Sequence, residues 1–302
     1  MKKPLPIILD TDIGSDIDDS WALAMALKSP EIDLKLVTTT SYHIEYQTKV
    51  AARLLEAAGR TDVKLAMGRG GFPAGDHLEE WVGDYDLSTY PNFSENAVDA
   101  IIETVMNSDE EITILCIGAM RNIADVYEKC PEITKKSRLV VIGGNIYNGH
   151  VVGWHPALGG DWNVRCDVGA WQRGIDASTW DVELLPLDVT GNVILEQKYF
   201  DRIKKAAETD PVLKELVGSN EVWFKAVQWN YYGATSALFD TVGVYACITH
   251  ENLKYQKLPV YANDEGVTLI DPERGKMMNV ALGWEDKERF YKFLTARLCD
   301  EI

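Results

Sequence analysis

The sequence predicts an α/β protein with an open, mostly parallel, twisted sheet, helices on both faces of the sheet, and a helical cap toward the C-terminus. Two observations lead to this prediction. In the first 190 residues, short apolar runs alternate with helical patterns, which is typical of βαβ units and a parallel sheet. After Thr190 the pattern changes to helical, aromatic-rich segments. We expect one domain over residues 1–302.

The predicted strands are continuous apolar runs, as expected for strands that are covered on both faces. They span residues 6–10, 34–40, 63–68, 112–118, 138–144 and 182–188. Helical patterns between them cover residues 47–59, which end at the cap-like Gly59, and residues 95–108.

The C-terminal third combines helices and strands. Residues 221–233 are predicted to be helical and rich in aromatic side chains, and residues 284–298 form a last amphipathic helix. Possible strands cover residues 258–263 and 267–282, the latter with a turn at 272–275. We expect these segments to cap the sheet and not to form a second domain.

Composition and charge limit the possible partners. The formal net charge of −17 argues against nucleic acid or an acidic membrane surface as a partner. No apolar stretch approaches the length of a membrane span, and the N-terminus does not resemble a signal peptide. The five cysteines are scattered, without metal-site spacing, so we expect buried thiols in a reducing compartment and a cytoplasmic location.

Small, polar or glycine residues crowd the ends of all six predicted strands in the first 190 residues. Open α/β sheets bind their ligands at the carboxyl ends of the strands. An ordinary βα turn would explain any one of these strand ends, but six together indicate a cleft along this edge of the sheet.

The first of these strand ends is rich in aspartate. Five aspartates lie within ten residues, namely Asp10, Asp12, Asp16, Asp18 and Asp19. Alternation along a strand sends Asp10 and Asp12 to the same side, whereas carboxylates at the start of the next helix are also explained by capping and by the helix dipole. Capping does not explain why Asp12 converges on the same point. Oxygen ligands without histidine or cysteine suit Ca²⁺ or Mg²⁺, so the cluster predicts a cation site.

Two other interpretations of the cluster are weaker. An EF-hand loop that began at Asp10 would need glutamate at its twelfth position, where Trp21 stands. The Asp10-x-Asp12 pattern after an apolar strand also resembles haloacid-dehalogenase-type phosphatases, but Gly14 replaces their usual Thr or Val. The acids that follow would repel a phosphate, so a metal-dependent phosphatase is the less favoured alternative.

The stretch ILDTDIGSDIDDSWAL (residues 8–23) resembles the N-terminal signature of the nucleoside hydrolase (inosine/uridine-preferring ribohydrolase) family. It differs by Ile13 in place of proline and by two extra residues before Asp18 and Asp19. Further segments in the family's order lie at residues 36–40, 116–124, 140–145, 159–167 and 238–244. One motif alone would be weak, but the ordered set is specific at the family level. The resemblance implies the nucleoside hydrolase fold.

In this family a Ca²⁺ ion holds the attacking water and two ribose hydroxyls. The resemblance implies Asp12 as metal ligand and as general base on that water. The other implied metal ligands are Asp19, Asp240 and the backbone carbonyl of Ile117. The residues implied to bind the ribose are Asp18, Asp161 and Asn163, and Asp10 would orient the metal shell. Asp16 has no counterpart in the family and is expected to be a helix cap.

The resemblance also implies the reaction. A ribonucleoside would be hydrolysed at its N-glycosidic bond to free base and ribose, through an oxocarbenium-like sugar that nearby carboxylates stabilise. The chain is expected to form a homo-oligomer, a dimer or a tetramer, as relatives tend to do.

The chain departs from the family pattern where ribose and base would lie. Asp161 replaces a glutamate, and Tyr42 or His43 stands near the position of an asparagine. Phe239 and Trp81 replace two histidines that activate the leaving base. These two rings would suit stacking on a purine, although core packing explains either ring equally well. We therefore expect purine ribonucleosides as substrates.

Other residues are weaker candidates. The loop histidines His77, His150 and His155 could supply a general acid, and residues 148–160 form a candidate lid. Aromatic residues near the predicted cap could line the base pocket, although core packing is the commoner role for them: Trp223, Trp229, Tyr231 and Tyr232. The missing histidines leave one alternative function open, a noncatalytic ribose- or nucleoside-binding protein that retains the metal site.

Overall fold

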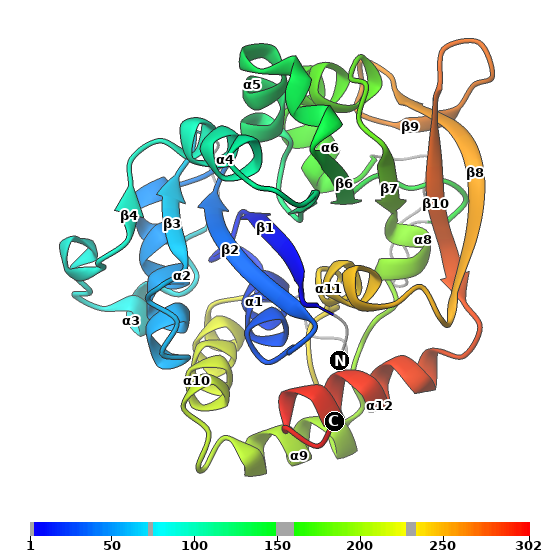
Figure 1. Cartoon of the computed structure of the whole chain (residues 1–302). Coiled ribbons are helices and arrows are strands. Elements are labelled where there is room, and N and C mark those ends of the chain that lie inside the picture. Colours follow the sequence, from blue (N-terminus) through cyan, green and yellow to red (C-terminus); the bar gives the residue numbers. More distant parts are fainter. Residues whose placement is uncertain (1–2, 72–74, 149–159, 228–233) are drawn as a thin grey trace.

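The computed structural model describes residues 3–71, 75–148, 160–227 and 234–302 (Figure 1). The strands within these ranges form one ten-stranded sheet in the order β4-β3-β2-β1-β5-β6-β7-β10-β8-β9. They are β1 (Leu5–Thr11), β2 (Ile32–Thr39), β3 (Lys64–Met67), β4 (Phe93–Ser94), β5 (Ile112–Cys116), β6 (Ser137–Ile142), β7 (Val182–Leu185), β8 (Leu253–Ala262), β9 (Thr268–Ile270) and β10 (Lys276–Trp284).

Helices lie on both faces of this sheet. They are α1 (Asp18–Leu27), α2 (Ile44–Ala57), α3 (Glu79–Val82), α4 (Ala97–Met106), α5 (Arg121–Lys129), α6 (Trp162–Cys166), α7 (Val168–Trp171), α8 (Leu187–Thr190), α9 (Gln197–Ala206), α10 (Pro211–Ala226), α11 (Thr241–Ile248) and α12 (Lys287–Leu298). Single turns of other helix types are η1 (Leu87–Thr89), η2 (Pro131–Lys135) and η4 (Gln172–Asp176).

The central strand β1 shows how the two faces are covered. Ile7 and Leu9 belong to a core cluster with buried residues of α1, α2, α10, α11 and α12. Ile8, which points the other way, belongs to a second cluster with α4, α5 and α7. Alternate residues of an apolar strand therefore enter opposite cores, which confirms the prediction of a sheet buried on both sides.

The sheet is mostly parallel, as predicted. β1 pairs in parallel with β2 on one side and with β5 on the other, and the parallel pairing continues through β7 to β10. Among the described strands, β8 pairs antiparallel with β10 on one side and with β9 on the other. Since the chain order reverses between β1 and β5, the topological switch point of the sheet lies there.

The region after Thr190 differs in detail from its prediction. The helix expected at residues 221–233 is α10, which begins at Pro211 because Asp210 caps it by accepting from the Leu213 amide at 2.9 Å. It ends at Ala226, and residues 228–233 lie outside the described part of the chain. The buried residues of α9 and α10 join the same core cluster as those of α1, so this cap is continuous with one layer of the sheet (Figure 1).

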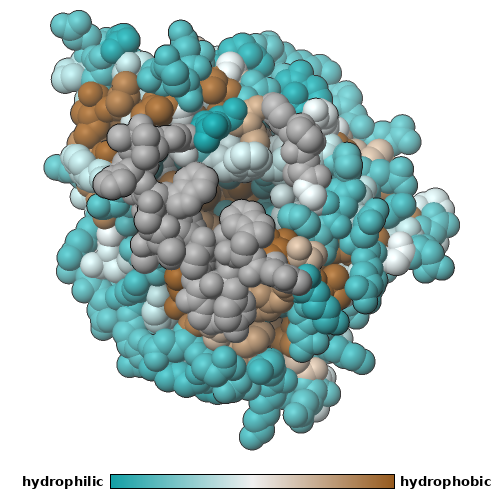
Figure 2. Space-filling model, turned by 180° about the vertical axis from the view of Figure 1, so that it is seen from behind, coloured by the Kyte–Doolittle hydropathy of each residue, from teal (hydrophilic) through white to brown (hydrophobic). Residues whose placement is uncertain are grey.

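The last three strands of the sheet, β10, β8 and β9, include exposed apolar side chains. Leu269 and Ile270 on β9 and Met277 on β10 are 39%, 40% and 59% exposed. Figure 2, which views the molecule from behind, shows apolar surface at its upper left, on the side of β8, β9 and β10. Among the described residues, no helix combines the length and apolar character needed to cross a membrane.

Candidate active site

A tight turn after β1 brings the aspartates together. Gly14 has a φ of 106°, in the left-handed region that favours glycine. A Cβ at this position would lie 2.8 Å from the ring of Tyr46, and the Tyr46 hydroxyl donates to the Gly14 carbonyl at 2.9 Å. The chain therefore reverses against Tyr46 and starts α1 at Asp18.

The turn brings Asp18 and Asp19 to Asp240, which immediately precedes α11. One carboxylate oxygen of each residue lies within 4.8 Å of the others, and all three side chains are buried. The Thr11 hydroxyl donates to Asp19. The set contains only hard oxygen donors, which is the donor type that Ca²⁺ and Mg²⁺ prefer.

The electrostatics of the cluster indicate that it suits a cation. Burial raises the pKa of Asp18 and Asp240 well above 3.8, and the charges of neighbouring aspartates raise it further. Burial also raises the pKa of Asp12, with a second contribution from Asp19, and raises that of Asp19 to about 7. So many carboxylates resist ionising together unless a positive charge compensates them.

The carboxylate of Asp10, two residues before Asp12, accepts hydrogen bonds from three side chains. It is fully buried, and its carboxylate accepts from Thr38 Oγ1 at 2.5 Å, from Asn122 Nδ2 at 2.7 Å and from Cys116 Sγ at 3.5 Å. Burial raises its pKa to about 6, against the effect of these bonds. This environment suits a supporting role better than direct contact with a ligand.

The segments after β5 and before α6 meet at the same edge of the sheet. The Ile117 amide donates to the Asp10 carbonyl at 2.8 Å, and the Ile117 carbonyl accepts from Asn163 Nδ2 at 2.8 Å. Asp161 caps α6 by accepting from the Val164 amide at 3.2 Å, and burial raises its pKa to about 6. The structure thus brings Ile117, Asp161 and Asn163 into one neighbourhood.

The structure distinguishes Tyr42 from His43. The Tyr42 side chain is buried, its hydroxyl accepts from Trp162 Nε1, and it lies 3.9 Å from Cys166 Sγ. Burial and the nearby charge of Asp12 raise the pKa of Tyr42. His43 is exposed, and its Nδ1 lies 2.6 Å from Asp76 Oδ2. Tyr42 is therefore the residue of this pair that reaches the aspartate cluster.

The two expected base-stacking rings have different surroundings. Phe239 is half-buried and immediately precedes Asp240. Trp81 is 7% exposed and belongs to the core, with the Arg53 guanidinium 4.3 Å from the centre of its ring. Because Arg53 covers the ring and the core encloses it, the structure favours a packing role for Trp81.

Three other candidates lie at the turn after β1. His77 Nδ1 lies 2.7 Å from the Ser15 carbonyl, and Trp223 Nε1 donates to the same carbonyl at 3.0 Å. Asp16 accepts from the Ile17 amide at 2.7 Å, but Ile17 is the residue that precedes α1, so Asp16 supports the turn and does not cap the helix.

The remaining candidates fall in segments that the structure does not describe. They are His150, His155, Trp229, Tyr231, Tyr232 and most of the loop 148–160.

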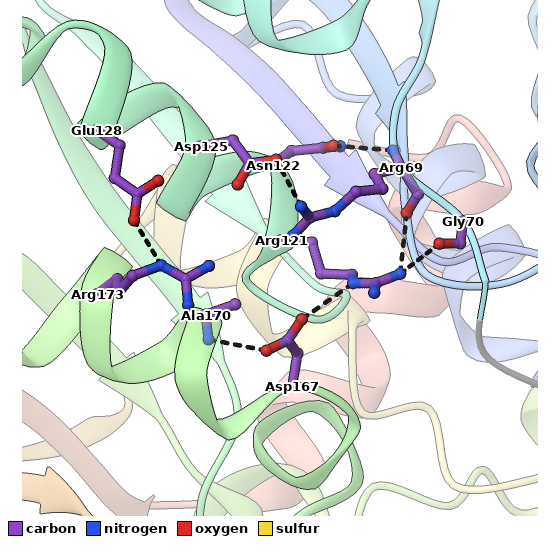
Figure 3. Close-up of polar contacts among 9 residues, drawn as sticks. All are labelled: Arg69, Gly70, Arg121, Asn122, Asp125, Glu128, Asp167, Ala170 and Arg173. Atoms are coloured by element: carbon purple, nitrogen blue, oxygen red, sulfur yellow. Dashed lines mark hydrogen bonds and ion pairs between the residues drawn. The ribbon is translucent and has the colours of Figure 1, made fainter.

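Sequence reasoning did not single out Arg121 and Asn122, which begin α5 (Figure 3). Asn122 Nδ2 also donates to the Thr39 carbonyl at 3.0 Å, and its Oδ1 accepts from the Arg69 amide at 3.3 Å. Arg121 donates to the Gly70 carbonyl at 2.5 Å and to Asp167 Oδ2 at 3.1 Å. The sequence feature that could have indicated Arg121 and Asn122 is their position shortly after β5, at the end of a strand that borders the predicted cleft.

The fold and the buried carboxylates define an α/β protein whose sheet switch point suits a hard cation. Residues 7–292 match the family model described as "Inosine-uridine preferring nucleoside hydrolase". The chain therefore belongs to this family, and it is an N-glycosyl hydrolase of the nucleoside hydrolase type.

Similar proteins and solved structures agree with this assignment. The chain is 32% identical over 225 residues to the non-specific ribonucleoside hydrolase RihC of Klebsiella pneumoniae. The aligned residues make up 70% of this chain and 71% of that protein. A solved plant nucleoside hydrolase superimposes with a TM-score of 0.81 at 25% identity, over 98% of this chain and 99% of its own. A purine-preferring ribonucleoside hydrolase from Gardnerella vaginalis shares the fold, with a TM-score of 0.78 at 24% identity over 98% of each chain.

Proposed function

We propose that this protein hydrolyses ribonucleosides to free base and ribose in a Ca²⁺-dependent reaction. The observation that carries the proposal is the group of buried carboxylates at the switch point of the sheet, where Asp18, Asp19 and Asp240 converge from distant parts of the chain. Membership of the nucleoside hydrolase family supplies the reaction type.

The cation would be held by Asp12, Asp19, Asp240 and the carbonyl of Ile117, with Asp18 close by. Carboxylate and carbonyl oxygens without nitrogen or sulfur are the usual ligands of Ca²⁺. When bound, the cation would compensate the buried negative charge and lower the pKa of the attacking water. The raised pKa values of these aspartates support this part of the proposal.

Asp12 acts as the general base. Its carboxylate takes the proton of the attacking water as the water adds to the anomeric carbon of the ribose. The side chains of Asp18, Asp161 and Asn163 hold the sugar hydroxyls. Positive charge develops on the sugar as the bond to the base breaks, and the surrounding buried carboxylates stabilise that charge.

We propose purine ribonucleosides as the preferred substrates, on the basis of Phe239. A ring at this position, next to Asp240, can stack on the large face of a purine. Trp81 does not contribute to this argument because it packs against Arg53. The ratio of kcat/KM for inosine to that for uridine measures the preference, and a ratio below one would contradict it.

The variant Asp12→Asn tests the central assignment. Asparagine keeps the shape of the side chain but is a far weaker base, so ribose release is expected to fall by about a hundredfold or more, with an unchanged circular dichroism spectrum. Asp176→Asn is the matched control, because burial also raises the pKa of Asp176 to about 6 while its carboxylate accepts from the Ala262 amide, away from the cluster. Full activity in Asp12→Asn would show that another group is the base.

A nucleoside panel with a reducing-sugar assay separates the proposed enzyme from the alternatives. A noncatalytic binder would show metal-dependent affinity for nucleosides and no ribose release by the wild-type protein. Activity on an aryl phosphate would favour a phosphatase.

A further inference from the structure

Arg121 connects three segments at the edge of the sheet where the candidate active site lies. It follows β5, and its guanidinium donates to the Gly70 carbonyl at 2.5 Å and to the Arg69 carbonyl at 3.5 Å, both after β3. Its Nε donates at 3.1 Å to Oδ2 of Asp167, which lies between α6 and α7 (Figure 3). The side chains of Arg121 and Asp167 are only 15% and 21% exposed, so solvent screens this ion pair less than it screens a surface pair.

The loop after β3 that Arg121 holds lies against the loop after β2. The Tyr42 carbonyl accepts from the Gly71 amide at 3.3 Å, and a Cβ at Gly70 would lie 2.3 Å from the Tyr42 carbonyl oxygen, so only glycine allows this approach. The Tyr42 hydroxyl in turn accepts from Nε1 of Trp162, the first residue of α6. Arg121 therefore reaches α6 by two routes, directly through Asp167 and indirectly through Gly70 and Tyr42.

The segment after β5 and α6 are joined twice by side chains. The Ile117 carbonyl accepts from Asn163 Nδ2 at 2.8 Å, and four residues further along each segment Arg121 donates to Asp167. Asn163 is a proposed ribose ligand, and the Ile117 carbonyl is a proposed ligand of the cation. Because α6 has only five residues and little intrinsic stability, contacts with other segments set its position relative to Ile117.

The surroundings of Asp167 separate the role of Arg121 from the stability of the fold. Asp167 Oδ1 caps α7 by accepting from the Ala170 amide at 2.9 Å, and buried residues of α7 share a core cluster with those of α5. Apolar packing therefore holds α7 without help from Arg121. The two other ion pairs in Figure 3 join Arg69 and Arg173 to residues of α5, and these arginines are 49% and 43% exposed. Such exposed pairs contribute little.

We propose that Arg121 is a positioning residue that holds α6 so that Asp161 and Asn163 are in place to bind the ribose. The inference rests on the proposed function, because it assumes that these two residues bind the sugar. A loosened α6 would have to be ordered by each sugar that binds, which weakens the binding of substrate and transition state alike. The loss of Arg121 should therefore raise KM and leave kcat largely unchanged.

The variant Arg121→Lys tests this role because it keeps the positive charge and removes the fork of donors that reaches Gly70 and Asp167 together. We expect KM for a ribonucleoside such as inosine to rise about tenfold while kcat changes by no more than about twofold. The Kd of free ribose, measured by isothermal titration calorimetry in the presence of Ca²⁺, should rise by a similar factor. This second measurement does not depend on turnover.

Asp167→Asn tests the same ion pair from the other side, and its side-chain oxygen can still cap α7. We expect a smaller rise in KM, about threefold, because Arg121 keeps its bond to the Gly70 carbonyl. The double variant should have a KM no higher than that of Arg121→Lys alone, since both substitutions break one ion pair.

Arg138→Lys is the matched control. Arg138 also joins a carboxylate and a neutral oxygen, because it donates to Glu183 Oε2 at 3.2 Å and to Thr113 Oγ1 at 3.1 Å, and its side chain is 24% exposed. It lies near the start of β6, at the opposite end of the strand from the candidate active site. The control should lose a similar amount of thermal stability and keep the wild-type KM, kcat and ribose Kd.

Four results would overturn the inference: a wild-type KM and ribose Kd in Arg121→Lys, a loss confined to kcat, additive effects of Arg121→Lys and Asp167→Asn, or an equal rise in KM in Arg138→Lys. Failure of the proposed function looks different. In that case the wild-type protein binds ribose but releases none from any ribonucleoside, and the ribose Kd of the variants alone decides whether Arg121 positions α6. A wild-type protein that binds no ribose would overturn both.

Discussion

At Asn122 a single side-chain amide satisfies groups from three parts of the active site. It donates to Asp10 and to the Thr39 carbonyl and accepts from the Arg69 amide. In Asn122→Ala the fully buried Asp10 carboxylate loses a donor, so we expect the free energy of unfolding to fall by about 3 kcal/mol. We also expect a lower kcat, because Asp10 supports the strand end that carries Asp12. Urea unfolding and ribose release measure the two effects.

The control for this prediction is Asn220→Ala. Asn220 is equally buried, but its Oδ1 accepts from Trp21 Nε1 at 3.0 Å, and its Nδ2 has no partner within the described residues. We expect a smaller loss of stability, about 1 kcal/mol, and an unchanged kcat. Equal losses in both variants would mean that the bonds to Asp10 have no special value.

The sequence predicted the acidic residues of the site better than their partners. Asp10, Asp12, Asp18 and Asp19 stand out because like charges rarely gather without a cation. Asn122 could not be found in this way. Its role depends on loops from separate strands that meet only in the folded sheet, and an isolated asparagine carries no local signal.

At the scale of the elements, Gly118 lets the ends of β1, β2 and β5 meet. A Cβ at this position would lie 2.9 Å from the Asp12 amide nitrogen and 2.9 Å from Thr40 Cγ2. Gly118→Ala must therefore push Asp12 away from its place. We expect kcat to fall at least about tenfold and stability to fall by about 2 kcal/mol, as in other overpacked sites.

Gly283→Ala is the matched substitution, because a Cβ there meets nothing within 4 Å. It should leave both kcat and the free energy of unfolding close to the wild-type values. Steady-state kinetics and urea unfolding on the two variants make the comparison. Wild-type activity in Gly118→Ala would show that the strand ends can separate without harm to the site.

The sequence predicted the long elements well and the short ones poorly. The predicted strand at residues 112–118 ends at Cys116, and the one at residues 182–188 ends at Leu185, after which α8 begins. Short helices such as α6 were not predicted at all. A helix of five residues has little intrinsic stability, and α6 exists because Asp161 caps it and because the strand ends around it hold it in place.

At the scale of the whole molecule, the strand order is what the sequence leaves open. Periodicity indicates a parallel sheet, but it does not show that β1 lies between β2 and β5. That order creates the switch point, and the packing of α11 against α1 and β5 then delivers Asp240 to it. The homo-oligomer expected from the sequence stays a prediction, and light scattering of the purified protein would measure it.

Because several buried aspartates lie close together in the site, we expect the stability of the protein to depend on both bound cation and pH. Without a bound cation, the pKa values of Asp10 and Asp161 are about 6 and that of Asp19 is about 7, all above the 3.8 of an unperturbed aspartate. Between pH 3.8 and about 7 the folded state then binds more protons than the unfolded state. The stability that these groups contribute is therefore greatest at low pH, falls as pH rises through this range, and levels off above it. A bound cation opposes this loss, because it stabilises the ionised carboxylates and binds only the folded state.

We therefore expect the difference in Tm between Ca²⁺-loaded and chelated protein to be small near pH 5 and to grow up to pH 8. Parallel titrations with Mg²⁺ measure the selectivity, since Ca²⁺ accepts a larger and less regular set of oxygens than Mg²⁺. In Asp240→Asn one buried carboxylate is removed, so the chelated protein should lose less stability with rising pH and should respond weakly to Ca²⁺. A Tm difference that is constant from pH 5 to 8, or a variant as responsive as the wild type, would place the cation elsewhere.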